Sequence, residues 1–447
     1  MTTRRFPTAA PVAFLLAGAM VLSACQERST ILPGKREPVR SVLQGAEALP
    51  LVEAENISAP ISLPAPVANS NWTHGIGSPS YRTAHPALSA SPQLAWSVNI
   101  GKGDSRKQRI TADPVVTGGL IFTLDADSLV TAVSTSGAIA WQRTLRPARD
   151  AEGDATGGGL ATDGETLFVS LGYGELAALD VATGAVRWTQ QLDATGSGRP
   201  TVFGNLVYLM VGDNAGWALD KSSGRIAWQV GTGGDITNVL GAPAPALTDD
   251  LAIFAFGSGE LQAVFRRGGL SRWNAAVLGE RPGRALSKID DVTGAPVVDG
   301  TRVYAGNQAG RMIAVDTGSG KRIWTANDGA IGTMYPIGGS VFALTDANEL
   351  VRLDADDGTR IWGIRLPNFV KDRPRRIAEV FAHHGPVVAG GLVRVASSDA
   401  QLRSVNPQDG SLAAITEIPG GGATTAPVIA GRTLYVVNRN GQLLAYR

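Results

Sequence analysis

The sequence predicts an all-β fold: an eight-bladed β-propeller in which each blade is a four-stranded antiparallel sheet. Three observations lead to this prediction: a repeat with a fixed tryptophan, a four-strand pattern within each repeat, and incomplete repeats at both ends of the repeating region. Periods of about 40 to 50 residues with four strands are typical of propellers, because one blade cannot bury both faces of its sheet and neighbouring blades must stack into a ring.

The repeat contains the pattern Ala-x-Asp-x-x-Thr-Gly-x-x-x-Trp, which is clearest from Ala178 to Trp188. A second element precedes it, Pro-Val-Val with a glycine turn and another apolar run, as at Pro114 and Pro296. Together they read as four strands, with Asp-x-x-Thr-Gly as a turn in which Asp and Thr bond the local backbone and Gly accepts a positive φ. The tryptophans are spaced by 38 to 51 residues and are Trp96, Trp141, Trp188, Trp228, Trp273, Trp324 and Trp362.

The two ends of the repeating region predict how the ring closes. Pro427 to Tyr446 supplies three strands, and the chain stops where a tryptophan strand is due. The missing strand stands at the other end, where Leu94 to Val98 has no upstream strands of its own. We therefore expect the N- and C-terminal strands to share the eighth blade. The seventh blade has Ala414 where tryptophan belongs, so we expect its interface to be less well filled.

The N-terminal residues predict export and lipidation. Residues 1–24 have a charged start and an apolar stretch too short to span a bilayer, as in a signal peptide. Leu22-Ser23-Ala24 precedes Cys25, the only cysteine, and this spacing resembles a bacterial lipobox. The resemblance implies that Cys25 carries diacylglycerol and an amide-linked acyl chain such as palmitate, and Gln26 favours the outer membrane. We read residues 25–68 as a disordered proline-rich tether, 69–93 as an irregular segment packing on the propeller, and 94–447 as the propeller.

Composition restricts the function classes. Without Arg4 and Arg5 the chain has 38 basic and 39 acidic residues, which indicates no nucleic-acid partner. With Cys25 acylated, no cysteine remains for a disulfide, although the compartment is oxidising. The repeated Asp residues lie on separate blades, and four histidines are few, so we expect no catalytic, cofactor-binding or metal-binding residues.

The repeated tryptophans are interpreted as structural. Each occupies the same place in its repeat, which suits an indole wedged between blades that shares a buried hydrogen bond. Trp217 lies outside this pattern and is the one candidate for a platform on which a ligand stacks.

These repeats resemble, over residues 94–447, the tryptophan-docking repeats of the pyrroloquinoline quinone (PQQ) propeller superfamily. Quinoprotein dehydrogenases of that superfamily hold PQQ and Ca²⁺, whereas the BamB lipoproteins use the propeller without a cofactor to bind BamA. The lipobox, the tether and the single ring resemble the BamB family. The resemblance implies a non-enzymatic scaffold, lipid-anchored on the periplasmic face of the outer membrane, that binds the periplasmic (POTRA) domains of BamA.

Such a scaffold would assist assembly and membrane insertion of outer-membrane β-barrel proteins, whose unfolded chains are a further partner to consider. Two alternatives stay open. One is a PQQ-dependent oxidoreductase, although such enzymes resemble one another in a vicinal disulfide that this sequence cannot form. The other is an envelope propeller that serves a different partner.

The resemblance also implies partner-binding residues in two loops that connect neighbouring blades. They are Val239, Leu240 and Gly241 in the loop 237–243, and Asp290, Asp291 and Val292 in the loop 288–293. Asp291 and Val239 match an acidic and an apolar position of the family motif, whereas Leu240 and Thr293 depart from it. Because both loops lead into Ala-Pro strands of adjacent blades, we expect them to form one surface, an apolar anchor with a charged rim.

Overall fold

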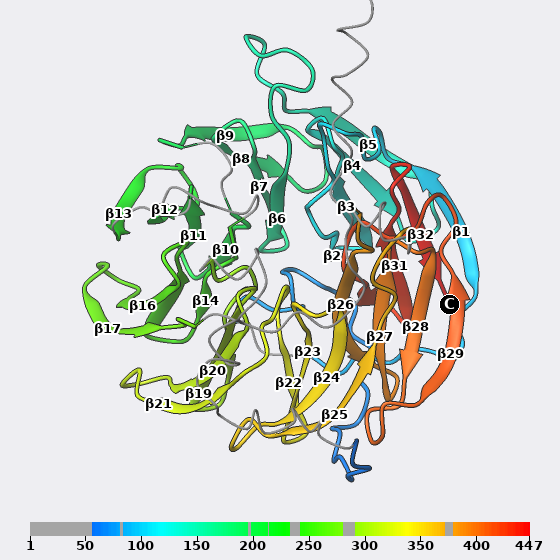
Figure 1. Cartoon of the computed structure of the whole chain (residues 1–447). Coiled ribbons are helices and arrows are strands. Elements are labelled where there is room, and N and C mark those ends of the chain that lie inside the picture. The colour runs from blue at the N-terminus through cyan, green and yellow to red at the C-terminus, as the bar shows by residue number, and fades with distance from the viewer. Residues whose placement is uncertain are drawn as a thin grey trace, which may run out of the picture.

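The computed structural model describes residues 56–80, 84–194, 198–212, 214–232, 242–279, 291–371 and 379–447. Over these ranges the chain forms eight four-stranded antiparallel sheets arranged in a ring, with no helix (Figure 1). The predicted eight-bladed propeller is confirmed. The search for a membrane-spanning helix in the same ranges finds none. The predicted signal peptide, Cys25 and the tether up to residue 55 lie outside the described residues.

The strands occupy four positions in each blade, from the axis of the ring to its rim (Figure 1). The innermost strands are β2 (Val115–Thr117), β6 (Gly158–Thr162), β10 (Thr201–Phe203), β14 (Ala246–Leu247), β18 (Val297–Asp299), β22 (Tyr335–Ile337), β26 (His383–Ala389) and β30 (Val428–Ala430). The second strands are β3 (Leu120–Leu124), β7 (Thr166–Leu171), β11 (Leu206–Val211), β15 (Leu251–Ala255), β19 (Arg302–Asn307), β23 (Ser340–Leu344), β27 (Leu392–Ser397) and β31 (Thr433–Val437). The third strands are β4 (Leu129–Ser134), β8 (Glu175–Asp180), β12 (Ala215–Asp220), β16 (Glu260–Phe265), β20 (Arg311–Asp316), β24 (Glu349–Asp354), β28 (Gln401–Val405) and β32 (Gln442–Tyr446). The outer strands are β5 (Ile139–Thr144), β9 (Val186–Gln191), β13 (Ile226–Gly231), β17 (Ser271–Ala276), β21 (Arg322–Ala326), β25 (Arg360–Arg365), β29 (Leu412–Glu417) and β1 (Leu94–Asn99).

The hydrophobic core lies between blades rather than within any one of them. In blade two, β7 and β8 are buried along almost their whole length, whereas every residue of the outer strand β9 is exposed or half-buried. Phe168 of blade two shares one buried cluster with Leu209 of blade three. Each blade therefore depends on its neighbours to exclude water from its sheet.

The ring closes as predicted, because the first and last strands of the propeller pair with each other. Strand β1 runs antiparallel to β32, with Leu94 opposite Tyr446 and Asn99 opposite Gln442. Gln93 and Arg447 extend the ladder through two backbone hydrogen bonds of 2.7 and 2.9 Å. Pairing the two chain ends gives the eighth blade its outer strand and leaves β32 with no free edge.

The connections of each blade alternate between two faces of the ring. In an antiparallel meander, the first and third turns of a blade lie on one face, which we call the turn face. The second turn and the loop to the next blade lie on the opposite face, which we call the loop face. The described ends of the two predicted partner loops, Ala242-Pro243 and Asp291 to Thr293, precede the innermost strands β14 and β18 and therefore belong to the loop face.

Residues 56–80 and 84–93, which we call the strap, cross the turn face. Ile57 N–H donates to the Ile361 carbonyl at 2.9 Å, and Trp72 exchanges two backbone hydrogen bonds of 2.8 Å with Val116. The tether predicted over 25–68 is thus too long, because residues 56–68 lie on the propeller. Prolines prevent a regular strand there, but they leave backbone carbonyls free to accept hydrogen bonds.

Two buried arginines hold the strap by its carbonyl groups. Arg352 in β24 donates to the carbonyls of Ala59 and Pro60 at 2.6 and 2.9 Å. Arg394 in β27 donates to those of Ser89 and Ala90 at 2.7 and 2.9 Å. Arg394 is fully buried and lies in line with Ser404 and Ala414. The interface between blades seven and eight, which we expected to be less well filled, therefore contains this side chain and the strap.

Aromatic and histidine side chains fix the middle of the strap. The Trp72 side chain is fully buried, and His74 Nε2 accepts a hydrogen bond from Val202 N–H at 3.0 Å. Burial lowers the pKa of His74 to about 3, so the ring is neutral and can accept this bond at pH 7. The strap thus ties blades one and three to blade six.

Candidate functional site

The seven repeated tryptophans all lie in outer strands and all face the next blade. Each indole N–H donates to a backbone carbonyl in the third turn of that blade, at 2.8 to 3.2 Å. The acceptors, in the order of the tryptophans, are the carbonyls of Thr135, Val181, Lys221, Arg266, Thr317, Ala355 and Pro407. These side chains bind blade to blade and leave no ring free to hold a ligand.

The glycine of the Asp-x-x-Thr-Gly turn receives the indole. A Cβ atom at Gly184 would lie 2.6 Å from the ring of Trp141, and the φ angle of Gly184 is +69°. The turn therefore needs glycine for the close approach as well as for its backbone conformation. Trp217, the candidate platform, is only 3% exposed and belongs to the core between blades two and three.

The structure describes two of the six predicted partner-binding residues, and both are buried. Asp291 is 6% exposed, and Val292 is 2% exposed and packs in the core between blades four and five. The expectation that these two side chains lie on an open surface is therefore wrong. The residues just before strand β18 lie between blades four and five, and the Val292 side chain fills part of that space. The other four residues, Val239, Leu240, Gly241 and Asp290, lie outside the described ranges.

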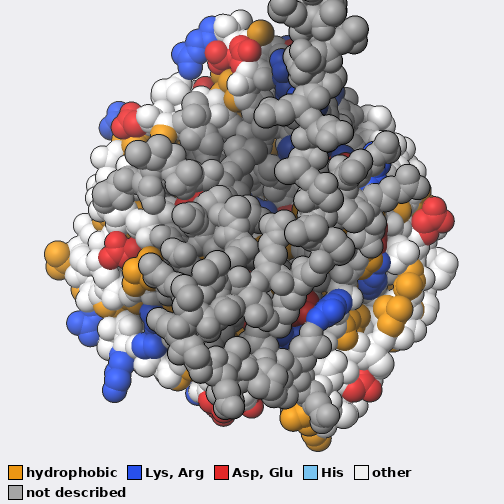
Figure 2. Space-filling model, viewed as in Figure 1, with side chains coloured by type: hydrophobic (Ala, Val, Ile, Leu, Met, Phe, Trp, Pro, Cys, Tyr) orange, Lys and Arg blue, Asp and Glu red, His pale blue; other side chains and the backbone are white. Residues whose placement is uncertain are grey.

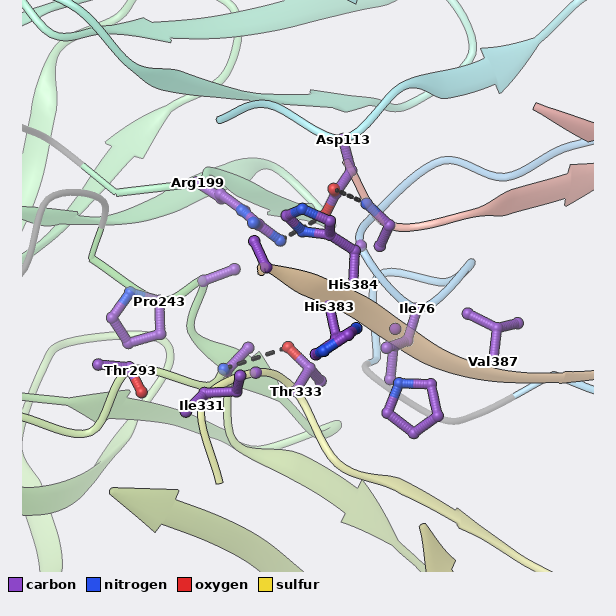
Figure 3. A pocket seen from close by; sticks show the side chains of 18 of the residues that line it. Ile76, Asp113, Arg199, Pro243, Thr293, Ile331, Thr333, His383, His384 and Val387 are labelled. Carbon is purple, nitrogen blue, oxygen red and sulfur yellow. Dashed lines mark hydrogen bonds and ion pairs between the residues drawn. The ribbon is translucent and has the colours of Figure 1, made fainter. Parts of the chain in front are cut away.

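Both predicted loops end at a cavity on the axis of the ring (Figure 3). The cavity measures about 300 Å³, and its wall includes Pro243 after the first loop and Thr293 in the second. Residues from blades one, three, six, seven and eight complete the wall, and Ile76 of the strap also lines it. The ends of the two loops thus meet at one place, the axial cavity, although they belong to different blades.

The cavity contains one ion pair and two histidines whose pKa values burial lowers, His383 and His384 (Figure 3). Arg199 Nη1 lies 2.5 Å from Asp113 Oδ2, and the other oxygen of Asp113 accepts Ala426 N–H at 2.9 Å. Burial lowers the pKa of His384 to about 4, against the opposing effect of Asp113, so His384 is uncharged at pH 7. The neighbouring ring of His383 is held by Ser397 and by the Pro367 carbonyl.

Sequence reasoning missed Asp113, Arg199 and His384, although a signal existed for the first two. Both stand immediately before a proline that begins an innermost strand, and Ala295 and Ala426 occupy the same place in other blades. That position faces the axis in every one of these blades. A charged residue there is therefore a charge on the axis.

The cavity does not fit PQQ with a divalent metal. Its only charged side chains in the described ranges neutralise each other, and most other lining residues are Gly, Ala, Pro, Thr or aliphatic. Within those ranges no group of three His, Cys, Asp or Glu residues could hold a metal ion. A carboxylated quinone and its cation need several charged partners of both signs at one site. On the face seen in Figure 2, basic and acidic side chains are interspersed around the rim.

Comparison with known proteins gives results at three levels. The sequence model of the family described as outer membrane protein assembly factor BamB matches residues 126–364, more than half of the chain. The BamB of Yersinia pestis is 24% identical over 361 residues, covering 80% of this chain and 89% of its own length. The BamB of Bordetella pertussis is 24% identical over 364 residues, covering 80% and 87%.

Solved structures support the fold. The crystal structure of BamB from Moraxella catarrhalis superposes with a TM-score of 0.65 and 19% identity, over 80% of this chain and 100% of that one. A quinohemoprotein alcohol dehydrogenase from Pseudomonas putida superposes with a TM-score of 0.66 and 15% identity, over 85% and 80%. At these identities, each comparison establishes the shared propeller alone.

Proposed function

Because the chain belongs to the family of the outer membrane protein assembly factor BamB, we propose that it is a non-catalytic scaffold of the outer-membrane β-barrel assembly machinery and binds BamA. The observation that carries the proposal is the family match together with relatives of that name, 87% or more of whose length this chain covers. The axial cavity supports a non-catalytic role, since its charges are paired with each other. The PQQ-dependent alternative has no such support in the cavity.

The loop face is the proposed surface for the periplasmic domains of BamA. The strap crosses the turn face from blade six to blades one and three, whereas the loops 237–243 and 288–293 end together at the axial cavity. We propose that Val239, Leu240, Gly241 and Asp290 contact BamA, and that Asp291 and Val292 hold the second loop in position. Unfolded outer-membrane proteins would then approach a machinery in which this ring sets the position of BamA.

Membrane attachment is proposed through acylation of Cys25, which would place the ring on the periplasmic side of the outer membrane. The strap begins at Asn56 on the outer strand of blade six, where the Asn56 side chain exchanges two hydrogen bonds of 2.9 and 3.0 Å with Gly363. The proposed tether is therefore residues 25–55. Labelled palmitate should enter the wild-type protein and not Cys25→Ser; equal labelling would contradict the lipid anchor.

Binding to purified BamA periplasmic domains tests the partner. Val239→Asp with Leu240→Asp should weaken binding by about 1–3 kcal/mol, because charge replaces the proposed apolar anchor. The matched control is Leu412→Asp with Ile415→Asp, at side chains 52% and 51% exposed on the rim of blade seven. The control should bind as the wild type does, and all three proteins should melt alike.

Equal binding of the loop variant and the wild type would remove this surface from consideration. Absence of BamA from material co-purified with the wild-type protein would instead favour an envelope scaffold with another partner. Charge reversal at Asp291 is a poor test, because a buried carboxylate with partners in the fold cannot be reversed without loss of stability.

A further inference from the structure

A groove on the turn face, between blades three and four, lies apart from the axial cavity and the proposed BamA surface. It has a volume of about 340 Å³. One wall is the first turn of blade three, Phe203 to Leu206, and the other is formed by Arg266 and Arg267 in the third turn of blade four. Tyr208 lies at its base.

The hydroxyl group of Tyr208 is buried, and its proton has no acceptor. The side chain is 0% exposed, and no acceptor lies within reach of the hydroxyl. Arg266 lies close enough to donate to the hydroxyl oxygen, but a guanidinium has only donors and cannot accept the hydroxyl proton. Burial raises the pKa of Tyr208, so the hydroxyl keeps its proton at neutral pH and remains a donor. Such a group usually costs free energy unless something pairs with it.

Packing alone does not explain this hydroxyl. The ring of Tyr208 lies 5.8 Å from that of Trp228, and Phe168 makes the equivalent contact with Trp188 at 6.0 Å. Phe122 and Phe342 do the same in their blades. Phenylalanine therefore satisfies the repeat at this position. Tyrosine also occurs there in blades five and eight, as Tyr304 and Tyr435, but of these three hydroxyls only that of Tyr208 is buried without an acceptor for its proton.

The guanidinium of Arg266 is held in a fixed position beside the groove. Its Nε donates to the Asp249 carbonyl at 3.0 Å, and its Nη2 donates to the same carbonyl. The guanidinium carbon lies 4.5 Å from the centre of the Phe203 ring. Arg266 is also fixed through its own carbonyl, which accepts the indole N–H of Trp228 at 2.8 Å. Among the described residues, neither Arg266 nor Arg267 forms an ion pair with a carboxylate. Two unpaired positive charges and a free donor thus meet at one groove.

We propose that this groove binds a phosphate group. The Tyr208 hydroxyl, the guanidinium groups of Arg266 and Arg267 and the Asn205 amide are donors that approach from both walls and the base. A tetrahedral oxyanion offers acceptors in several directions, whereas the planar carboxylate suits a bidentate fork that Arg266 does not present, since Nε is already occupied. Phosphate in solution and the phosphate of a lipid headgroup share this chemistry.

Titration of the full-length protein with inorganic phosphate, followed by calorimetry at constant ionic strength, tests the proposal. Wild-type protein should bind phosphate at one site and bind acetate more weakly. Tyr208→Phe and Arg267→Gln should each lower phosphate affinity about tenfold, the effect of losing one hydrogen bond to a charged group. The matched control Tyr304→Phe, at the equivalent position in blade five and outside the groove, should leave affinity unchanged.

The source of the phosphate is distinguished by vesicle binding of protein without its acyl chains. Sedimentation with phosphatidylglycerol vesicles that depends on Tyr208 would identify a lipid headgroup, and phosphate binding without such sedimentation would identify a soluble ligand. Absence of phosphate binding by the wild type, equal affinity of Tyr208→Phe and wild type, or equal binding of acetate and phosphate would each overturn the proposal. The Tyr208→Phe variant should fold at least as stably as the wild type without phosphate, because it removes an unpaired hydroxyl.

Discussion

Seven interfaces between blades are built alike, and the eighth, between blades seven and eight, is built differently. In the seven, an indole from one blade enters the third turn of the next and donates to its backbone. In the eighth blade no such turn exists, because its third and fourth strands, β32 and β1, belong to opposite ends of the chain. A tryptophan on β29 would have nothing to enter, and Ala414 stands in its place.

Three substitutions accompany this missing turn. Strand register places Phe168, Ala178 and Trp188 of blade two in line with Arg394, Ser404 and Ala414 of blade seven. The Arg394 guanidinium donates to Ser404 and to the strap, and Thr416 of β29 donates to the Pro92 carbonyl at 3.4 Å. The strap residues that precede β1 thus replace the turn. The comparison teaches that the seventh repeat is adapted to the ring closure rather than decayed.

Removing the closure strand has the largest expected effect on this comparison. Deletion of residues 94–100 should abolish the folded ring, because it exposes the edge of β32 and releases the strap from the eighth blade. Circular dichroism and size-exclusion chromatography should show aggregation. A melting curve identical to the wild type would contradict the closure mechanism.

Removing a docked indole should be the next largest effect. Trp362→Ala should cost about 3–5 kcal/mol in free energy of unfolding, since the side chain is fully buried and its loss leaves a cavity and removes one of the two donors to the Pro407 carbonyl. Urea denaturation measures this cost. If Trp362→Ala cost less free energy of unfolding than a substitution of an exposed side chain, such as Leu412→Ala, the indoles would not be what holds the blades together.

Arg394→Met tests the arginine contact with the strap that takes the place of the docked indole. We expect a loss of about 1–3 kcal/mol, because the carbonyls of Ser89 and Ala90 lose their donor while the removal of a buried charge offsets part of the cost. Burial lowers the pKa of Arg394 to about 10, so the side chain is charged at neutral pH. Protease cleavage within the strap should accelerate in the variant. Unchanged cleavage and an unchanged free energy of unfolding would show that the hydrogen bonds from Arg394 to the strap do not stabilise the fold.

Ala414→Trp tests whether the interface between blades seven and eight can accept a docked indole, as the other seven interfaces do. The register of Ala414 with Ser404 equals that of Trp188 with Ala178, so the strand position itself is right for an indole. We nevertheless expect destabilisation of about 1–3 kcal/mol from overpacking, because Arg394 and the strap fill the space. Stabilisation in urea denaturation would mean that the interface is a poorly filled copy of the others.

Two truncations test where the strap begins. The shorter of them, deletion of residues 28–55, has the smallest expected effect of all these changes. Deletion of residues 28–55 should leave the free energy of unfolding unchanged, whereas deletion of 28–66 should lower it, since Arg352 then loses the carbonyls of Ala59 and Pro60. Differential scanning calorimetry of both proteins measures the difference. Equal melting temperatures would place residues 56–66 back in the tether.

Patterns confined to one repeat determined most of the fold. The blades were predicted from the period, the turn Asp180-x-x-Thr183-Gly184 and the tryptophan of each outer strand. These residues contact partners at a nearly constant separation along the chain, so the pattern is visible in the sequence. The incomplete ends predicted the closure, since a strand missing at one end and a spare strand at the other can only complete each other. Local spacing carries this information because propeller contacts repeat from blade to blade.

Contacts between distant, non-repeated residues needed the tertiary structure. The sequence alone read residues 56–68 as a tether, because prolines show that a strand is excluded but not that Arg352 will donate to the carbonyls of Ala59 and Pro60. It also placed Asp291 and Val292 on a surface, whereas packing between blades four and five buries them. The axial pair of Asp113 and Arg199, 86 residues apart in the chain, and the unpaired hydroxyl of Tyr208 exist only once the ring has closed. Such features depend on which side chains meet in space, and no periodic pattern records them.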